Sequence, residues 1–201
     1  MGSLESAGYR PVRIWTRGGY TGPFNAAKSL VRKLLGKRSL PSSRDDQRAR
    51  MFAKSWIQTA WITLAMFDLI LVYGCYFRWL RLAGRTVIAD RYLWDTWIDF
   101  ILNFPNVKFD LWPLWKLLKI VTPHPHHSFL LLIPVEESVR RSKLKSEPFP
   151  DSEDVLRLRL QYYEKLGLEM GWKTIQCSRP IAEIAAEITG HVIMPESNTV
   201  R

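Results

Sequence analysis

The feature that most restricts how this chain can fold is an apolar run from Trp56 to Phe77, in which Asp68 is the only charged residue. A helix over these residues would be long enough to cross a bilayer. However, a carboxylate near the middle of a membrane would cost about 2.5–3.5 kcal/mol, and basic residues at both ends of the run favour neither orientation. We therefore expect a helix buried in a protein core. The alternative is a membrane-associated protein anchored by residues 56–77.

The composition is that of a globular protein. The chain has 201 residues, of which 47% are hydrophobic and 24% are charged, so it can bury a core as a single domain over residues 1–201. These figures exclude a disordered chain, collagen and a disulfide-rich miniprotein. Cys75 and Cys177 lie in apolar surroundings, which indicates buried free thiols in a reducing compartment. No secretory signal opens the chain, and we expect a cytoplasmic location.

The positive charge is concentrated at the amino-terminal end. The net charge is +10, and residues 1–50 hold eleven Lys and Arg against three Asp and Glu. The rest of the chain is nearly balanced. An excess of this kind predicts an anionic partner: nucleic acid, a membrane surface or a phosphorylated small molecule. Nucleic acid is not expected as a partner, because no recognised nucleic-acid-binding motif accompanies the charge.

Short apolar strands alternate with helices along the chain. We expect strands at 12–16, 86–89, 128–133 and 173–176. We expect helices at 25–35, 46–82, 92–102, 114–120, 135–145, 152–166 and 181–189. Parallel strands joined by helices of this length are typical of an α/β fold with a mostly parallel sheet.

The strongest local motif follows the second of these strands. Asp90, Arg91 and Tyr92 stand at its carboxyl end, and ligands bind at that edge of an open parallel sheet. A carboxylate there can orient a hydroxyl group or hold Mg²⁺ through water, and a guanidinium can bind phosphate with two hydrogen bonds. The alternative is a salt-bridged pair that caps the next helix.

The residues GRTVIADRYLWDTWIDF, from Gly84 to Phe100, resemble the Asp-Arg-Tyr/His segment of the thymidylate kinase family of P-loop nucleoside monophosphate kinases. VRIWTRGGYTGP, from Val12 to Pro23, is similar to the family's second strand and its Thr-Arg-Glu-Pro-Gly loop, except that Gly18 and Gly19 replace Glu-Pro. Segment 128–166 resembles the family's fourth strand, its basic lid and the helix that follows. Segment 172–188 resembles the last strand and its helix. The resemblance implies a P-loop kinase-like three-layer fold.

The resemblance also implies a reaction and a set of site residues. The reaction is ATP-dependent phosphoryl transfer, with Mg²⁺, to a nucleoside monophosphate similar to dTMP. The implied catalytic residues are Asp90, Arg91, Arg140, Arg141 and Lys145. Asp90 would also bind the metal ion. Arg17, Tyr92 and Asp95 would bind the acceptor, Arg179 and Pro180 would lie along the adenine, and residues 136–152 would form the lid. A homodimer through the long helix 46–82 is also implied.

One element of the family is missing from these residues. The 201 residues contain no Walker A segment, G-x-x-x-x-G-K-[ST]. Residues 4–10 resemble the last turn of the family's first helix, so we expect the chain to begin after the phosphate loop. Without the central first strand, strand 12–16 with 86–89 should be separate from strand 128–133 with 173–176. We therefore expect impaired transfer; the alternative is a non-catalytic remnant that binds a nucleotide or partner.

Other candidate residues have a plainer interpretation. His124, His126 and His127 are expected in a loop that enters a strand rather than in a metal site. Trp61 and Phe67 are expected in the core. Asp68 is expected to face a pocket or a dimer partner, because an unpaired buried carboxylate is costly.

Overall fold

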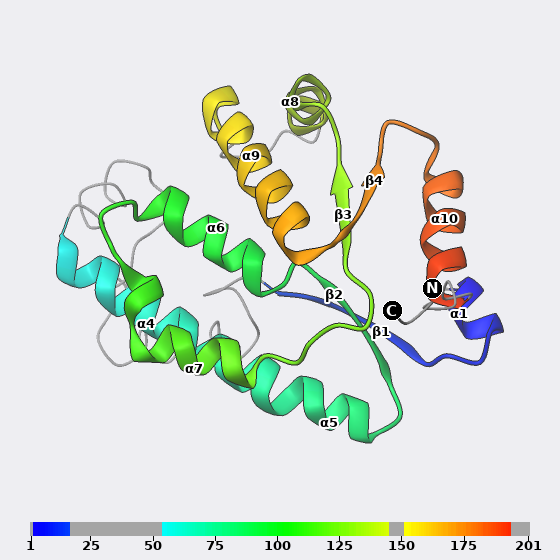
Figure 1. Cartoon of the computed structure of the whole chain (residues 1–201), viewed down its shortest axis with the longest axis horizontal. Helices are drawn as coiled ribbons and strands as arrows, with labels where there is room; N and C mark the ends of the chain where they lie inside the picture. Colours follow the sequence, from blue (N-terminus) through cyan, green and yellow to red (C-terminus); the bar gives the residue numbers. More distant parts are fainter. Residues whose placement is uncertain (1, 17–53, 145–150, 194–201) are drawn as a thin grey trace. The chain divides into compact units, whose positions relative to one another are not determined.

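The computed structural model describes residues 2–16, 54–144 and 151–193, which form a mixed α/β protein with parallel strands (Figure 1). The chain divides into two compact units. Residues Arg10–Pro123 form one unit, which we call the β1–β2 unit. The residues up to Tyr9 and from His124 onward form the other, which we call the β3–β4 unit.

The β1–β2 unit combines two parallel strands with several helices. Its elements are β1 (Pro11–Trp15), α4 (Ser55–Leu71), a π-helical segment (Val72–Tyr76), α5 (Phe77–Leu82), β2 (Thr86–Asp90), α6 (Leu93–Asn103), a 3₁₀ turn (Phe109–Leu111) and α7 (Pro113–Val121). The register places Pro11 opposite Thr86 and Trp15 opposite Asp90. The carboxyl ends of both strands therefore lie side by side.

One face of α4 builds the core of this unit. Ile62, Ala65, Met66 and Leu69 follow the helical period, and all four side chains are fully buried. They belong to one hydrophobic cluster with aromatic and aliphatic residues of the following segments, among them Tyr73, Phe77, Phe109, Trp115 and Leu118. The expectation of a buried helix is confirmed for this face.

The opposite face of the same helical stretch is exposed and apolar. The residues Trp56, Ala60, Leu64, Phe67, Leu71, Cys75, Trp79 and Leu82 recur every three or four positions and are all exposed; we call them the exposed stripe. The expectations that Phe67 is a core residue and Cys75 a buried thiol are therefore wrong, since both lie on this face. Ser55–Leu82 is long and apolar enough to cross a membrane, a property that core helices of soluble proteins share.

The β3–β4 unit pairs two further strands. Its elements are α1 (Gly2–Ser6), β3 (Phe129–Leu132), α8 (Val135–Leu144), α9 (Glu153–Met170), β4 (Lys173–Gln176) and α10 (Ile181–Ile193). β3 and β4 are parallel, with Phe129 opposite Lys173. Helix α9 packs closely here, because a Cβ atom at Gly167 would lie 2.9 Å from a methyl carbon of Leu130.

The strands pair as the sequence indicates. β1 pairs with β2 and β3 pairs with β4, and among the described residues these are two separate two-stranded sheets. The expected helix at 25–35 and the first residues of the helix expected at 46–82 lie outside the described residues. Cys75 and Cys177 are both free thiols, and Cys177 is partly buried. His124–His127 form a loop that enters β3, as expected.

Candidate functional site

The carboxyl end of β2 carries an ion pair with its neighbouring strand. In the observed register, Arg13 and Asp90 point to the same face of the two strands. The Arg13 Nε lies 3.2 Å from the Asp90 Oδ2, and an Nη of Arg13 donates to the same oxygen. The hydrogen bonds to Asp90 raise the pKa of Arg13. Both side chains remain more than one-third exposed, so a phosphate or a cation can compete for either partner.

Arg91 occupies an unusual backbone conformation directly after β2. Its φ of 69° lies in the left-handed region, which costs a non-glycine residue about 1–3 kcal/mol. Strained residues of this kind concentrate at functional sites. The Arg91 Nη1 lies 3.5 Å from the Oδ2 of Asp99, a largely buried carboxylate, while the Arg91 side chain is 35% exposed. The guanidinium therefore lies beside Asp99, while the side chain as a whole stays partly exposed to solvent.

Tyr92 and Asp95 lie at the start of helix α6: Tyr92 directly precedes the helix and Asp95 lies in its first turn. The backbone N–H of Tyr92 donates to the Asp95 Oδ2 at 2.8 Å, which caps the helix. The Tyr92 hydroxyl donates to the carbonyl oxygen of Pro123 at 2.5 Å. Burial raises the pKa of Tyr92, so the hydroxyl stays protonated and keeps this bond. Both residues thus shape the turn that follows Arg91.

The arginines expected in the lid bind a glutamate on their own helix. In α8, Arg140 donates to both carboxylate oxygens of Glu137 at 2.7 and 2.8 Å, and Arg141 donates to one of them at 2.7 Å. Arg141 also donates to the carbonyl oxygen of Cys177 at 3.4 Å. These hydrogen bonds lower the pKa of Glu137 to about 2. At neutral pH the carboxylate therefore competes with any anion for the two arginines.

The loop expected along the adenine leads into α10. Arg179 donates to Glu187 and, through Nε, to the carbonyl oxygen of Gln176 at 3.4 Å. The carbonyl oxygen of Pro180 accepts the Glu183 N–H at 3.1 Å, in the first turn of the helix. Arg179 is therefore engaged on both sides of the loop.

The expected site residues thus fall into two groups. Asp90, Arg91, Tyr92 and Asp95 lie together in the β1–β2 unit, whereas Arg140, Arg141, Arg179 and Pro180 belong to the β3–β4 unit. Arg17 and Lys145 lie outside the described residues. Over the described ranges, His, Cys, Asp and Glu form no group of three that could hold a metal ion.

Several partners of the site residues were not expected from the sequence. Arg13, Thr16 and Glu137 contact expected site residues directly. Glu137 could have been found, because the spacing of three and four residues to the arginines places them on one helix face. No comparable signal exists for Arg13 or Thr16, since their contacts depend on how β1 pairs with a strand more than seventy residues later.

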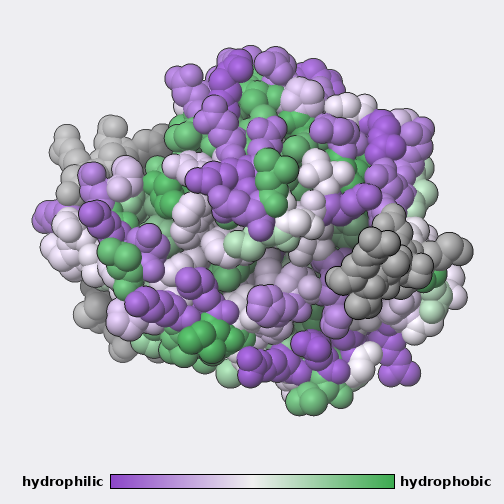
Figure 2. Space-filling view, in the orientation of Figure 1, coloured by the Kyte–Doolittle hydropathy of each residue, from purple (hydrophilic) through white to green (hydrophobic). Residues whose placement is uncertain are grey.

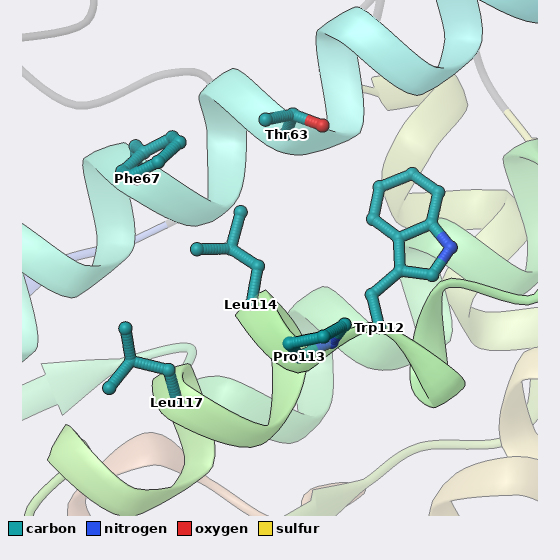
Figure 3. A pocket seen from close by; sticks show the side chains of 6 residues that line it. All are labelled: Thr63, Phe67, Trp112, Pro113, Leu114 and Leu117. Carbon is teal, nitrogen blue, oxygen red and sulfur yellow. The ribbon is translucent and has the colours of Figure 1, made fainter.

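An apolar pocket lies between α4 and α7. It has a volume of about 650 Å³ and is lined by Thr63, Phe67, Trp112, Pro113, Leu114 and Leu117. Figure 3 shows Thr63 and Phe67 on one helix, across from the residues of the other. None of these six described residues is charged, so they offer a phosphate no charged partner. Hydrophobic side chains also gather over α7 in Figure 2, where Leu117 and Ile120 are exposed.

No protein-family model matches the chain, and no curated protein matches it either. The resemblance to thymidylate kinases therefore rests on the motifs quoted above.

Proposed function

We propose that the chain binds a nucleoside monophosphate at the carboxyl end of β2, as a relative of the thymidylate kinases with impaired phosphoryl transfer. The observation that carries this proposal is Arg91, which follows a parallel strand in a left-handed turn and whose side chain is 35% exposed. Ligands of open parallel sheets bind at this edge. A guanidinium there suits a phosphate, because its N–H groups match two phosphate oxygens at once.

ATP and Mg²⁺ belong to the same proposal. Asp90 would contribute one carboxylate oxygen to Mg²⁺, which is mostly held by phosphate oxygens and water in sites of this kind. The Asp90 side chain is 37% exposed, which fits that role once the Arg13 side chain turns to bind a phosphate. The loop with Arg179 and Pro180 would follow the adenine. Arg140, Arg141 and Lys145 would offset the charge of the transferred group.

Replacement of Arg91 by alanine should weaken the binding of dTMP at least tenfold, because the phosphate loses a charged partner with two donors. Thymidine, which lacks the phosphate, should bind both proteins with similar affinity. The measurement is isothermal titration calorimetry. The matched control is Arg85→Ala, which removes an exposed arginine from the other end of β2 and should leave both affinities unchanged. Equal dTMP affinity in the Arg91→Ala protein would contradict the assignment.

Phosphoryl transfer by the 201-residue chain should be close to the uncatalysed background. The sequence holds no G-x-x-x-x-G-K-[ST] segment, whose backbone amides and lysine bind the β- and γ-phosphates in P-loop kinases. The assay supplies ATP, Mg²⁺ and dTMP and follows ADP release. Transfer at background with intact dTMP binding is the expected result, whereas ordinary turnover would contradict the prediction of impaired transfer.

Glu137 should titrate near pH 2 rather than near its usual 4.5, since three hydrogen bonds from Arg140 and Arg141 stabilise its charged form. Because the pKa is lowered in the folded protein, its contribution to stability is present above pH 4.5 and is lost as the pH falls toward 2. Carboxyl NMR measures the midpoint. The double variant Arg140→Gln/Arg141→Gln should return it toward 4.5. Lys143→Gln, on the same helix, is the control and should not.

The exposed stripe supports a second part of the proposal, a homodimer. Ser55–Leu82 spans 28 residues, so the stripe is roughly 40 Å long, and no residue in it is charged. Its spacing of three and four residues suits packing against another helix. A membrane fits less well, since a spanning helix would have to remove Asp68 and the buried face of α4 from the core. We therefore propose a second copy of this chain as the occupant.

A further inference from the structure

The left-handed turn at Arg91 is tied to the core through its carbonyl oxygen. The Thr16 hydroxyl donates to this oxygen at 2.6 Å, from the residue that directly follows β1. The same Thr16 oxygen accepts a hydrogen bond from the Tyr73 hydroxyl at 3.1 Å. A chain of two hydrogen bonds therefore connects the helical stretch 55–82 with the turn.

The direction of this chain follows from the chemistry of its members. A carbonyl oxygen can only accept, so the single hydroxyl hydrogen of Thr16 is committed to Arg91. Thr16 must then accept from Tyr73, whose phenol is the donor. Hydrogen bonds that follow one another in the same direction along a chain of hydroxyl groups strengthen each other. The two bonds thus form a unit in which each depends on the other.

Both hydroxyl groups are fixed in place by burial. Tyr73 is 0% exposed and Thr16 is 1% exposed. The ring of Tyr73 packs against those of Phe77 and Tyr92, with centroids 5.3 and 4.8 Å apart. Tyr73 itself lies in the π-helical segment, and such segments occur frequently at functional sites. Water cannot readily replace either hydrogen bond, because the hydroxyl groups are shielded from solvent.

Arg91 is consequently held at two points. Its carbonyl oxygen is bound to Thr16, and its guanidinium lies beside the carboxylate of Asp99. A non-glycine residue at this φ returns to a common conformation unless neighbouring groups prevent it. The buried hydroxyl pair supplies that restraint on the backbone.

We propose that Thr16 and Tyr73 are positioning residues, which hold the turn after β2 so that the Arg91 guanidinium faces the phosphate of the bound nucleotide. This inference rests on the proposed function and adds the residues that give Arg91 its direction. Neither residue touches the nucleotide in this role. Loss of a positioning residue should therefore weaken the binding of the nucleotide, which has a phosphate, and leave the binding of the nucleoside unchanged.

The test compares dTMP with thymidine by calorimetry in Thr16→Val, Thr16→Ser and Tyr73→Phe. Thr16→Val removes the hydroxyl and should weaken dTMP binding about tenfold while thymidine binding stays within twofold. Thr16→Ser keeps the hydroxyl and should restore the dTMP affinity. Tyr73→Phe removes only the outer bond and should have an intermediate effect. In the Arg91→Ala background, Thr16→Val should cause no further loss.

Equal losses for dTMP and thymidine in Thr16→Val, or an unchanged dTMP affinity, would overturn the inference. A second measurement separates it from the nucleotide proposal. In the unliganded protein, Thr16→Val should shift or broaden the backbone NMR resonances of Arg91 and Tyr92, and Thr16→Ser should leave them in place. If the wild-type protein binds neither probe, the nucleotide proposal fails, and these resonances alone decide whether the pair holds the turn. Circular dichroism confirms that each variant is folded.

Discussion

Replacement of Leu118 by alanine is expected to lower the free energy of unfolding by about 2–5 kcal/mol. Leu118 is 0% exposed and belongs to the hydrophobic cluster of the β1–β2 unit, together with Trp115 and Phe109. Phe109 and Trp115 meet edge to face at 5.4 Å, so rigid rings line part of this cluster. Rigid surroundings collapse little when a side chain is removed. The cavity that remains therefore adds to the free energy that is lost with the buried side chain.

The matched control is Leu111→Ala in the same unit. Leu111 is 65% exposed, and its truncation should change the free energy of unfolding by no more than about 0.5 kcal/mol. Urea unfolding followed by far-UV circular dichroism measures both variants. A loss of less than 1 kcal/mol in Leu118→Ala would show that this cluster does not form the core of the unit.

Replacement of Leu71 by aspartate is expected to weaken self-association at least a hundredfold. Leu71 is 55% exposed and lies near the middle of the exposed stripe. In a twofold dimer, residues near the centre of such a stripe lie close to their own copies, because the interface uses the same surface on both chains. Two aspartates would then face each other in an apolar interface, where an unpaired charge is costly. Sedimentation equilibrium measures the dissociation constant.

The control for this variant is Leu168→Asp. Leu168 is 86% exposed on α9 in the β3–β4 unit, so it introduces the same charge away from the stripe and should leave self-association unchanged. A wild-type protein that is monomeric at all concentrations would refute the dimer. Co-sedimentation with vesicles of anionic lipid, abolished by Leu71→Asp but not by Leu168→Asp, would instead favour a membrane surface as the occupant.

Much of the local structure was predictable from the sequence. The last strand, 173–176, has the expected bounds, and β3 lies within the apolar run expected at 128–133. The long helix ends at Leu82 as expected, because Gly84 adopts a φ of 68° that favours glycine. These features depend on residues close together in the chain, where the period of apolar side chains and the terminating glycines act directly.

Which face of α4 is buried could not be predicted from the sequence. Both faces of the helix are apolar, so its period could not tell which face enters the core. Phe67 was therefore expected inside and lies outside, whereas Met66, its neighbour in sequence, is fully buried. The choice between the two faces is made by the shape and side chains of α7 and the other segments that pack on α4.

The candidate site was likewise predictable only in part. Asp90, Arg91 and Tyr92 were identifiable because three chemical groups follow one apolar strand without interruption. Only the tertiary structure shows that Asp90 meets Arg13 and that Thr16 holds the carbonyl oxygen of Arg91. The physical reason is that hydrogen-bond partners of this kind come from segments far apart in the sequence. The register of β1 against β2 brings them together, and no local pattern of residues determines that register.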